Sequence, residues 1–256
     1  MPKLLLFDLD GTLLCSDKTI SPRTLKALQR SREMGYLIGI STSRAIHNCI
    51  TFLPALTPDL FIASGGAVVQ YRGENIYTAE FSVEETRTMI DMARKVCGQD
   101  CEITVDSLNG HYWNYKIDPN KKDATWGDTI YTDFEGFDHK ALKFCVQIFD
   151  DAHAELLKNR FSHCDWARFE GGFWYKFTRK DATKEYAIQK ACQILGIDLE
   201  DVTAFGDDIP DIGMLKLCGT GIAMGNAFDV VKEAADLVIG SNDEDGIAVY
   251  LEESCR

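Results

Sequence analysis

Residues 3–14 read KLLLFDLDGTLL, and this stretch decides the fold. A short apolar run at 3–7 (KLLLF) ends at Asp8, which opens a polar loop containing Asp10 and Gly11. The pattern predicts a buried strand of a parallel sheet followed by an acidic loop. Because ligands bind at the carboxyl ends of the strands in open α/β sheets, we expect Asp8 and Asp10 to belong to a functional site.

The same alternation of strand and helix patterns is found toward both ends of the chain. Helices are predicted over 22–34, 44–53, 183–195, 210–217 and 227–234, and strands over 36–40, 59–63, 202–206, 220–224 and 236–239. Strands and helices that alternate with short links predict a parallel sheet with helices on its faces.

The middle of the chain has a different pattern. Residues 67–81 predict a hairpin that turns at Arg72-Gly73, and residues 82–97 predict a helix. Several β-like runs follow between 101 and 178, with a helix over 151–160. We therefore expect a core formed by residues 1–78 and 183–256, with an inserted α+β domain over residues 79–182.

Composition argues against several classes of partner. The net charge of −13 argues against binding to nucleic acid and to anionic membrane surfaces. The apolar runs are too short for a signal peptide or a membrane span. Nine irregularly spaced cysteines predict free thiols rather than a zinc site. These features predict a cytoplasmic protein.

The spacing of Asp8 and Asp10 fits phosphoryl chemistry. One carboxylate can attack phosphorus to form an acyl phosphate, and the second can protonate the leaving oxygen and later deprotonate water. A solvated Asp-Gly turn is the alternative interpretation of the same residues.

Two further groups of polar residues lie beside predicted strands. Asp207 and Asp211 follow the strand at 202–206 and offer hard oxygen ligands for Mg²⁺, although acids at a helix N-terminus also occur without a metal. The run from Ser41 to Arg44 follows the strand at 36–40 and can bind phosphate or cap a helix. Lys184 can add a positive charge, or it can be a solvated lysine.

These motifs, taken in order, resemble the haloacid dehalogenase (HAD) superfamily in its Cof-like sugar-phosphatase branch. The resemblance is carried by FDLDGTLL at 7–14, STSR at 41–44, Lys184 in DATKEYAI, GDDIPDIGML at 206–215 and the tail at 221–248. It implies a Rossmann-like parallel core with an inserted α+β cap that selects the substrate.

The resemblance also implies the roles of single residues. Asp8 is expected to be the nucleophile and Asp10 the general acid/base. The phosphate-binding residues are expected to be Gly11, Thr42, Ser43 and Lys184. Mg²⁺ is expected at Asp8, Asp10 (through its backbone carbonyl) and Asp207, with Asp211 in support. In the cap, His111, Trp113 and Trp174 are candidates for substrate specificity.

The sequence departs from the family pattern at a few positions. Pro210 stands where Asn is usual, Ser43 stands where Gly is usual, and Ser64-Gly65-Gly66 replaces Asn-Gly-Ala. Pro210 removes a side-chain donor, and one such donor is commonly worth a few kcal/mol in a transition state.

The predicted function is Mg²⁺-dependent hydrolysis of a small phosphorylated metabolite through a phosphoaspartate, in a monomer or homodimer. A sugar phosphate is the first expectation, and a nucleotide or pyridoxal phosphate stays open. The alternatives are a phosphomutase or phosphotransferase with the same nucleophile, and a weakened protein that binds a phosphometabolite without turnover.

Overall fold

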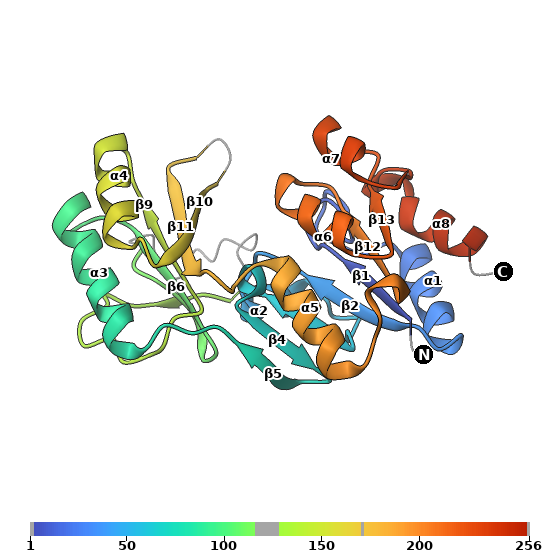
Figure 1. Cartoon of the computed structure of the whole chain (residues 1–256), viewed down its shortest axis with the longest axis horizontal. Helices are drawn as coiled ribbons and strands as arrows, with labels where there is room; N and C mark the ends of the chain where they lie inside the picture. Colours follow the sequence, from blue (N-terminus) through green and yellow to red (C-terminus); the bar gives the residue numbers. More distant parts are fainter. Residues whose placement is uncertain (1–2, 116–127, 170–171, 255–256) are drawn as a thin grey trace. The chain divides into compact units, whose positions relative to one another are not determined.

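A computed structural model of the chain describes residues 3–115, 128–169 and 172–254. Internal contacts divide the chain into two compact units, whose elements are labelled in Figure 1. Unit 1 comprises Met1–Ser43, Phe52–Tyr77 and Thr183–Arg256. Unit 2 comprises Arg44–Thr51 and Thr78–Ala182.

Unit 1 is built on an eight-stranded sheet in the order β14-β13-β12-β1-β2-β3-β4-β5. All pairs from β14 to β3 are parallel, and β4 joins β3 antiparallel. In chain order the strands are β1 (Leu4–Phe7), β2 (Leu37–Ser41), β3 (Leu60–Ala63), β4 (Val68–Tyr71), β5 (Glu74–Thr78), β12 (Val202–Gly206), β13 (Thr220–Ala223) and β14 (Leu237–Val238).

Strand β1 lies at the centre of this sheet because every one of its residues is apolar and buried. Leu4 is in register with Val202 of β12 on one side and with Leu37 of β2 on the other. At the end of the strand Phe7 stacks on Phe205, with ring centroids 4.6 Å apart. This packing fixes where the chain leaves the sheet after residue 7.

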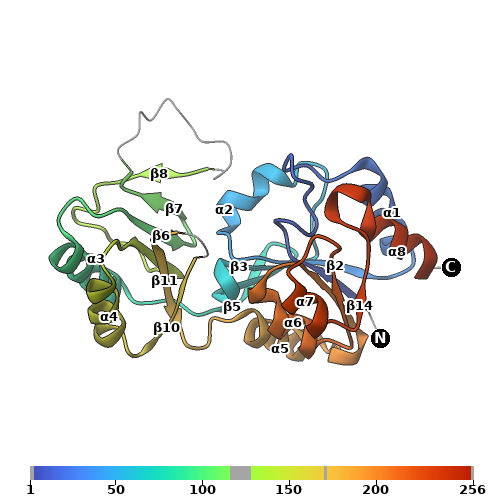
Figure 2. The same cartoon turned by 90° about the horizontal axis from the view of Figure 1, so that it is seen from above.

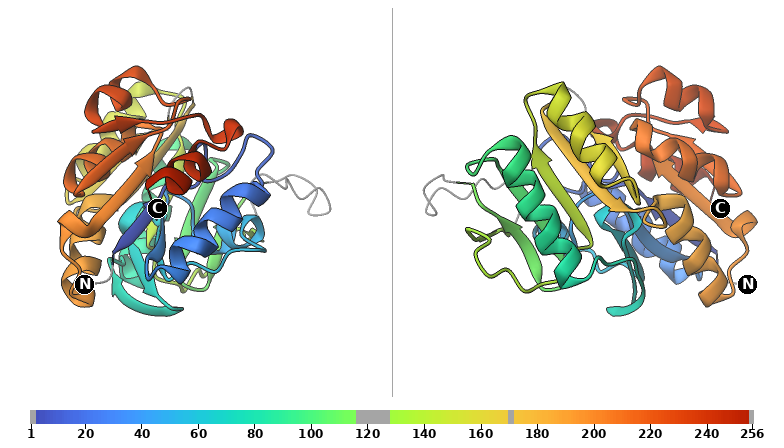
Figure 3. Two further views of the ribbon diagram at one scale, coloured as in Figure 1. Left: turned by 90° about the vertical axis from the view of Figure 1, so that its right-hand side faces the viewer. Right: turned by 60° about the vertical axis from the view of Figure 1, so that its left-hand side comes forward.

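Helices cover both faces of the unit 1 sheet (Figure 3). On one side α1 (Pro22–Glu33) packs with α8 (Gly246–Ser254). On the other side lie α5 (Lys184–Leu195), α6 (Ile212–Leu217) and α7 (Asp229–Ala234). The Ser21 side chain accepts a hydrogen bond from Thr24 N, which confirms the predicted start of α1. Helix α8 was not predicted, since its sequence begins with glycine and lacks a capping signal.

Unit 2 contains a six-stranded sheet in the order β10-β11-β9-β6-β7-β8. Its helices α3 (Val83–Cys97) and α4 (Asp151–Arg160) pack together on one face of that sheet (Figure 2). The strands are β6 (Ile103–Ser107), β7 (Gly110–Trp113), β8 (Ile130–Tyr131), β9 (Lys143–Gln147), β10 (Cys164–Arg168) and β11 (Trp174–Arg179). The short helix α2 (Ile46–Cys49) contacts β7.

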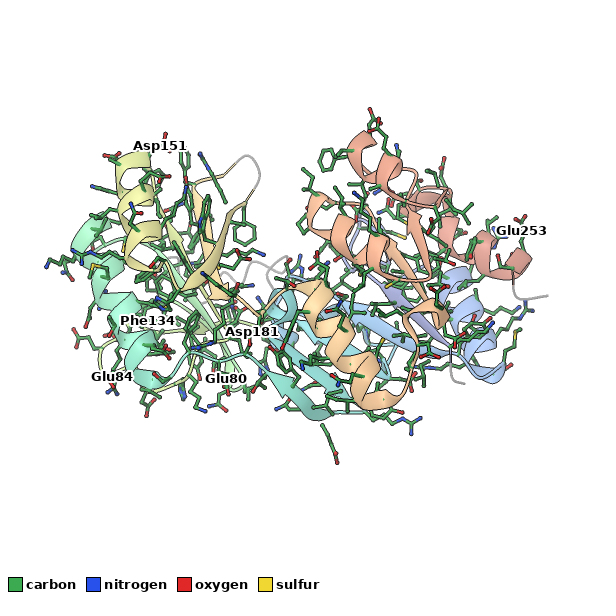
Figure 4. All side chains as sticks on the ribbon, viewed as in Figure 1. Glu80, Glu84, Phe134, Asp151, Asp181 and Glu253 are labelled. Carbon is green, nitrogen blue, oxygen red and sulfur yellow. The ribbon has the colours of Figure 1, made fainter. Side chains whose placement is uncertain are left out.

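Each of the two long unit 2 helices has a solvent-exposed acidic side chain in its first turn. Glu84 in α3 and Asp151 in α4 are both labelled in Figure 4. Negative charge near a helix N-terminus interacts favourably with the helix dipole and stabilises the helix. The positions of these residues agree with the predicted helix starts near 82 and 151.

The predicted α/β class with a parallel core sheet is confirmed by this topology. The eight cysteines within the described residues are all free, and Cys255 lies outside those residues. Between residues 3 and 254, gaps aside, no helix is both long and apolar enough to cross a membrane.

Candidate functional site

Asp8 is the first residue after β1, and the loop that follows folds back tightly. Its N–H donates to the carbonyl of Phe205 at 2.9 Å, which continues the β1–β12 pairing by one residue. Gly11 has a φ of +81°, and a Cβ placed there would lie 2.3 Å from Oδ2 of Asp207. Only glycine therefore allows the loop after Asp8 to approach the loop after β12 so closely.

Lys184 connects the two loops. It is the first residue of α5, whose N-cap Thr183 accepts a hydrogen bond from Tyr186 N. Its Nζ donates to Oδ1 of Asp8 and to Oδ1 of Asp211, both at 2.6 Å. All three side chains are buried, so the lysine lies as one cation between two carboxylates.

The loop after β12 is organised by Asp211. Its Oδ2 accepts the backbone N–H groups of Asp207 and Asp208, each at 3.1 Å. Pro210 lies within the 3₁₀ turn Ile209–Asp211 that brings Asp211 back under this loop. The loop is therefore held by the carboxylate of Asp211.

Thr12 orients the remaining carboxylate. Its Oγ1 donates to Oδ1 of Asp207 at 2.6 Å. Asp8, Asp207 and Asp211 each offer an oxygen, and these oxygens all lie within 4.8 Å of one another.

The charge at this cluster is unbalanced. Three ionised carboxylates and one ammonium leave two negative charges, which is the charge that one divalent cation would neutralise. Burial and the neighbouring Asp211 raise the pKa of Asp8 well above its ordinary value, although Lys184 opposes this rise. Burial raises the pKa of Asp207 to about 6. Hard oxygen donors with raised pKa values fit Mg²⁺ well, because a bound cation would favour their ionised forms.

Asp10 lies further along the same loop and is partly exposed. Its Oδ1 accepts a hydrogen bond from Nζ of Lys18 at 2.7 Å. Asn226 donates to the backbone carbonyl of Gly11 at 2.8 Å and so ties the loop to the segment after β13.

Thr42 and Ser43 follow β2, the strand next to β1, so their loop begins one strand away from Asp8. Thr42 is buried, and its N–H donates to the carbonyl of Ile62 at 2.9 Å. Its carbonyl accepts the N–H of Gly65 at 3.1 Å, which joins this loop to the Ser64-Gly65-Gly66 turn. Gly66 has a φ of +105°, and a Cβ there would lie 2.2 Å from the carbonyl oxygen of Thr183. That departure from the family pattern thus lets the turn pack against the start of α5.

The family model of the haloacid dehalogenase-like hydrolases matches residues 5–251. The chain belongs to this family. The match includes every loop described above, and it confirms both the family and the predicted enzyme class of HAD-type hydrolase.

Named relatives of this hydrolase are phosphatases. The 5-amino-6-(5-phospho-D-ribitylamino)uracil phosphatase YcsE of Bacillus subtilis is 30% identical, and the alignment covers 96% of this chain and 93% of that protein. The pyridoxal phosphate phosphatase YbhA of Escherichia coli is 28% identical over 97% of each chain. The solved structure of the HAD subclass IIB sugar phosphatase BT4131 has a TM-score of 0.80 and 25% identity, and the match covers 99% of each chain.

The predicted cap residues of this hydrolase all lie in unit 2. His111 and Trp113 belong to β7, and Trp174 begins β11. The indole of Trp113 contacts the ring of Trp174, with centroids 6.0 Å apart, and the ring of His111 at 6.4 Å.

Some residues without a predicted role lie beside predicted site residues in the structure. Thr12 orients Asp207, Lys18 pairs with Asp10, and Asp106 contacts both His111 and Lys143. Thr12 stands within the quoted FDLDGTLL motif, so its position was available as a signal. No local pattern marks Lys18, Asp106 or Lys143, since their partners come from loop closure and strand register.

Proposed function

We propose that this hydrolase is a Mg²⁺-dependent phosphatase that hydrolyses a small phosphorylated metabolite through a phosphoaspartate at Asp8. The observation that carries the proposal is the buried contact of Asp8 with Lys184, beside the carboxylates of Asp207 and Asp211. The phosphatase names of relatives that align along nearly the whole chain support it.

Asp8 and Asp207, together with the backbone carbonyl of Asp10, are the groups we propose for holding Mg²⁺. When bound, Mg²⁺ would neutralise negative charge between Asp8 and the phosphoryl group. Both oxygens of Asp211 already accept hydrogen bonds, so we assign to it the holding of the loop and of Lys184, with contact to the cation through water.

In the proposed first step Asp8 attacks phosphorus, the bond to the leaving oxygen breaks, and Asp10 donates its proton to that oxygen. In the second step Asp10 takes a proton from water, which attacks the phosphoaspartate and releases inorganic phosphate. Lys184, Thr42, Ser43 and the backbone N–H of Gly11 are proposed to bind the phosphoryl oxygens. Lys184 suits this role because its pKa is raised by Asp211 and Asp8 against the opposing effect of burial, so it stays charged.

Two alternative functions make different predictions. A phosphomutase or phosphotransferase would return the phosphoryl group to an alcohol instead of releasing phosphate. A weakened binding protein would show affinity without turnover. The reason to consider it is Pro210, which lacks the side-chain donor of the usual Asn.

The test is phosphate release from generic phosphate esters with Mg²⁺, with EDTA, and with the Asp8→Asn variant. The proposal expects release with Mg²⁺ that EDTA and the substitution both abolish. Undiminished release by Asp8→Asn would contradict the assignment, and tight binding with no release would favour the binding protein.

The physiological substrate is proposed at the level of a phosphomonoester of a small alcohol. A sugar phosphate, the first expectation from sequence, stays a prediction, as do the monomeric or homodimeric state and the cytoplasmic location. The named relatives include one that acts on pyridoxal phosphate and one that acts on a ribitylaminouracil phosphate. Recognition of the alcohol is proposed to belong to the cap, unit 2.

A further inference from the structure

The tail at 221–248 carries part of the family resemblance, yet no step proposed above uses it. It contains β13, α7, β14 and the start of α8. Strands β1, β12, β13 and β14 run parallel, so their carboxyl ends share one edge of the unit 1 sheet. The segments that follow β13 and β14 therefore lie at the same edge as the loop that follows β1.

These two segments of the tail are joined to each other by their backbones. The N–H of Gly225 donates to the carbonyl of Gly240 at 3.2 Å. Gly246 begins α8, and a Cβ placed there would lie 2.2 Å from the carbonyl oxygen of Gly240. Only glycine therefore allows α8 to start so close to this junction. The two segments are thus fixed relative to each other.

Asn226 and Asn242 connect the tail to the loop after β1, and we call this pair the amide clamp. Nδ2 of Asn226 donates to the carbonyl of Gly11 at 2.8 Å, and its Oδ1 accepts the N–H of Asn242 at 3.1 Å. Nδ2 of Asn242 donates to the carbonyl of Leu14 at 2.9 Å. The amide of Asn226 suits both of its partners, because it has a donor for the carbonyl and an acceptor for the N–H.

Contacts between serines and aspartates extend this connection along the same loop. Ser16 donates from its backbone N–H and from its hydroxyl to the two carboxylate oxygens of Asp243, at 2.7 and 2.6 Å. The hydroxyl of Ser21 donates to Oδ1 of Asp245. The tail therefore holds the loop at several places between residues 11 and 21.

The amide clamp acts on the part of the loop that carries the proposed Mg²⁺ and phosphoryl contacts. The carbonyl of Asp10 and the N–H of Gly11 belong to one peptide group, and the clamped carbonyl of Gly11 belongs to the next. Thr12, which follows, orients Asp207 through its hydroxyl. Gly11 has a φ of +81°, and glycine has more conformational freedom to lose than any other residue. A hydrogen bond to its carbonyl from outside the loop therefore restricts the loop to one conformation.

We propose that Asn226 and Asn242 are positioning residues for phosphoryl transfer. The amide clamp keeps the backbone from Asp10 to Thr12 in one conformation, on which the proposed contacts to Mg²⁺ and phosphate depend. Neither asparagine is assigned a contact with the reacting atoms, so both act through the loop. This inference rests on the proposed phosphatase function and adds positioning residues to its site. Small displacements of binding groups lower rates strongly, since an error of about 1 Å can cost about 10²-fold.

Asn226→Ala tests the clamp at its contact with Gly11. Asn226 is exposed, so the substitution leaves the apolar core intact. We expect the dissociation constant of Mg²⁺, measured by calorimetry, to rise by about three- to tenfold, the usual value of one hydrogen bond. With p-nitrophenyl phosphate and saturating Mg²⁺ we expect kcat to fall by about the same factor or more while KM changes little, because a misplaced loop affects the transition state more than ground-state binding. A loss of folded protein would instead lower the calorimetric stoichiometry and leave the affinity unchanged.

Three further variants separate the clamp from a general effect of losing an amide. Asn75→Ala is the matched control, since Asn75 is an exposed asparagine of β5, at the end of the sheet, and its Oδ1 accepts a hydrogen bond from Gln70 at 2.9 Å. Asn226→Gln keeps the donor and the acceptor and is expected to recover most of the affinity and of kcat. Asn242→Ala loses only the contact with Leu14 and is expected to have a smaller effect than Asn226→Ala. Equal losses in Asn75→Ala and Asn226→Ala would overturn the proposal.

Amide hydrogen exchange tests the clamp in the metal-free protein, without any reaction. Leu13 and Leu14 both donate backbone hydrogen bonds within the loop. We expect Asn226→Ala to speed the exchange of these two amides by about three- to tenfold and Asn75→Ala to leave it unchanged. Faster exchange with unchanged Mg²⁺ affinity and kcat would overturn the proposal, because the clamp would then serve the fold alone.

These measurements also distinguish failure of the clamp from failure of the phosphatase function. If the wild-type protein releases no phosphate from p-nitrophenyl phosphate, the phosphatase function fails, and exchange together with Mg²⁺ affinity still decides the clamp. If the wild type releases phosphate and Asn226→Ala equals it in exchange, affinity and kcat, only the clamp fails.

Discussion

Two buried ionic networks, one in each unit, have opposite composition. In unit 1 a single lysine, Lys184, lies between the carboxylates of Asp8 and Asp211. In unit 2 a single carboxylate, Asp106, lies between Lys143 and His111. The distances are similar, from 2.6 to 2.8 Å, so the difference lies in the balance of charge.

The direction of the pKa shifts shows what each balance does. The pKa of Asp8 is raised by burial and by Asp211, so the ionised carboxylate is energetically unfavourable in the folded protein. The pKa of Asp106 is held far below its ordinary value by Lys143 and His111, which overcome burial. The unit 1 network therefore has an excess of negative charge, which suits a bound cation and a catalytic role. In the unit 2 network the carboxylate is paired with positively charged or hydrogen-bonding partners, so this network stabilises the fold of unit 2.

The largest expected effect is on activity, from Asp8→Asn. Loss of the nucleophile is expected to lower kcat by at least about 10³-fold, because the remaining groups only bind and orient the substrate. The same substitution removes a carboxylate whose ionised form is unfavourable, so the thermal midpoint of the metal-free protein is expected to stay equal or rise. Phosphate release and thermal melting of the same preparation check both results, and a marked fall in the midpoint would contradict the comparison.

Asp106→Asn is expected to act in the opposite sense, on stability. It leaves Lys143 charged and buried without its partner, which costs about 3–5 kcal/mol of unfolding free energy. Asp138→Asn is the matched control, because Asp138 is an aspartate of the same unit with a side chain 74% exposed; its change is expected to be within about 0.5 kcal/mol. Urea unfolding measures both, and equal effects would show that the network is not stabilising.

This effect has a defined pH dependence. Because the folded pKa of Asp106 lies below its unfolded value, the stabilisation is complete above about pH 4 and is lost as the pH falls below it. The difference between the wild type and Asp106→Asn is therefore expected to shrink in acid.

Thr12→Val tests how the unit 1 carboxylates are oriented. The hydroxyl of Thr12 holds Oδ1 of Asp207, and partners of metal ligands typically contribute about 10–100-fold in affinity. We expect Mg²⁺ affinity, measured by calorimetry, to fall by that factor with little change in fold. Thr19→Val is a control in the same segment, since Thr19 donates only to the exposed Asp17. Unchanged affinity in Thr12→Val would show that this hydrogen bond does not orient Asp207 for Mg²⁺.

The smallest effect is the pH dependence of Mg²⁺ binding. Asp207 has a pKa raised to about 6, and a carboxylate must be ionised to bind the metal. Affinity is therefore expected to be constant above about pH 7 and to fall by up to about tenfold per pH unit below 6. The stability of the metal-free protein is expected to change in the opposite direction. Its free energy of unfolding rises as the pH falls through 6, because protonation of Asp207 removes an unfavourable buried charge. Calorimetry across this range checks the first expectation, and a flat profile would contradict it.

The sequence predicted the unit 1 site better than the unit 2 network for a physical reason. Asp8 and Asp10 stand in one short motif after a strand, and the carboxyl ends of parallel strands share one edge of the sheet. The predicted strands at 3–7 and 202–206 do pair, so Asp8 and Asp207 come together as this rule requires. The effect on activity of Pro210, which lacks the side-chain donor of the usual Asn, stays a prediction.

The unit 2 network depends on antiparallel register, which is set by packing across the whole sheet. A shift of one residue between β6 and β9 would turn Asp106 away from Lys143, and no local motif reports that alignment. His111 and Trp113 could be proposed from their residue types, but the carboxylate that orients His111 could not.

The central claim is that the Asp8 carboxylate becomes covalently phosphorylated during turnover. The direct measurement is acid quenching of the enzyme with acetyl phosphate and Mg²⁺, followed by borohydride reduction and peptide mass spectrometry to locate the modified residue. We predict that the acyl phosphate is found at Asp8 and is absent from Asp8→Asn. Phosphate release with the acyl phosphate on another residue, or continued turnover in Asp8→Asn, would contradict the account.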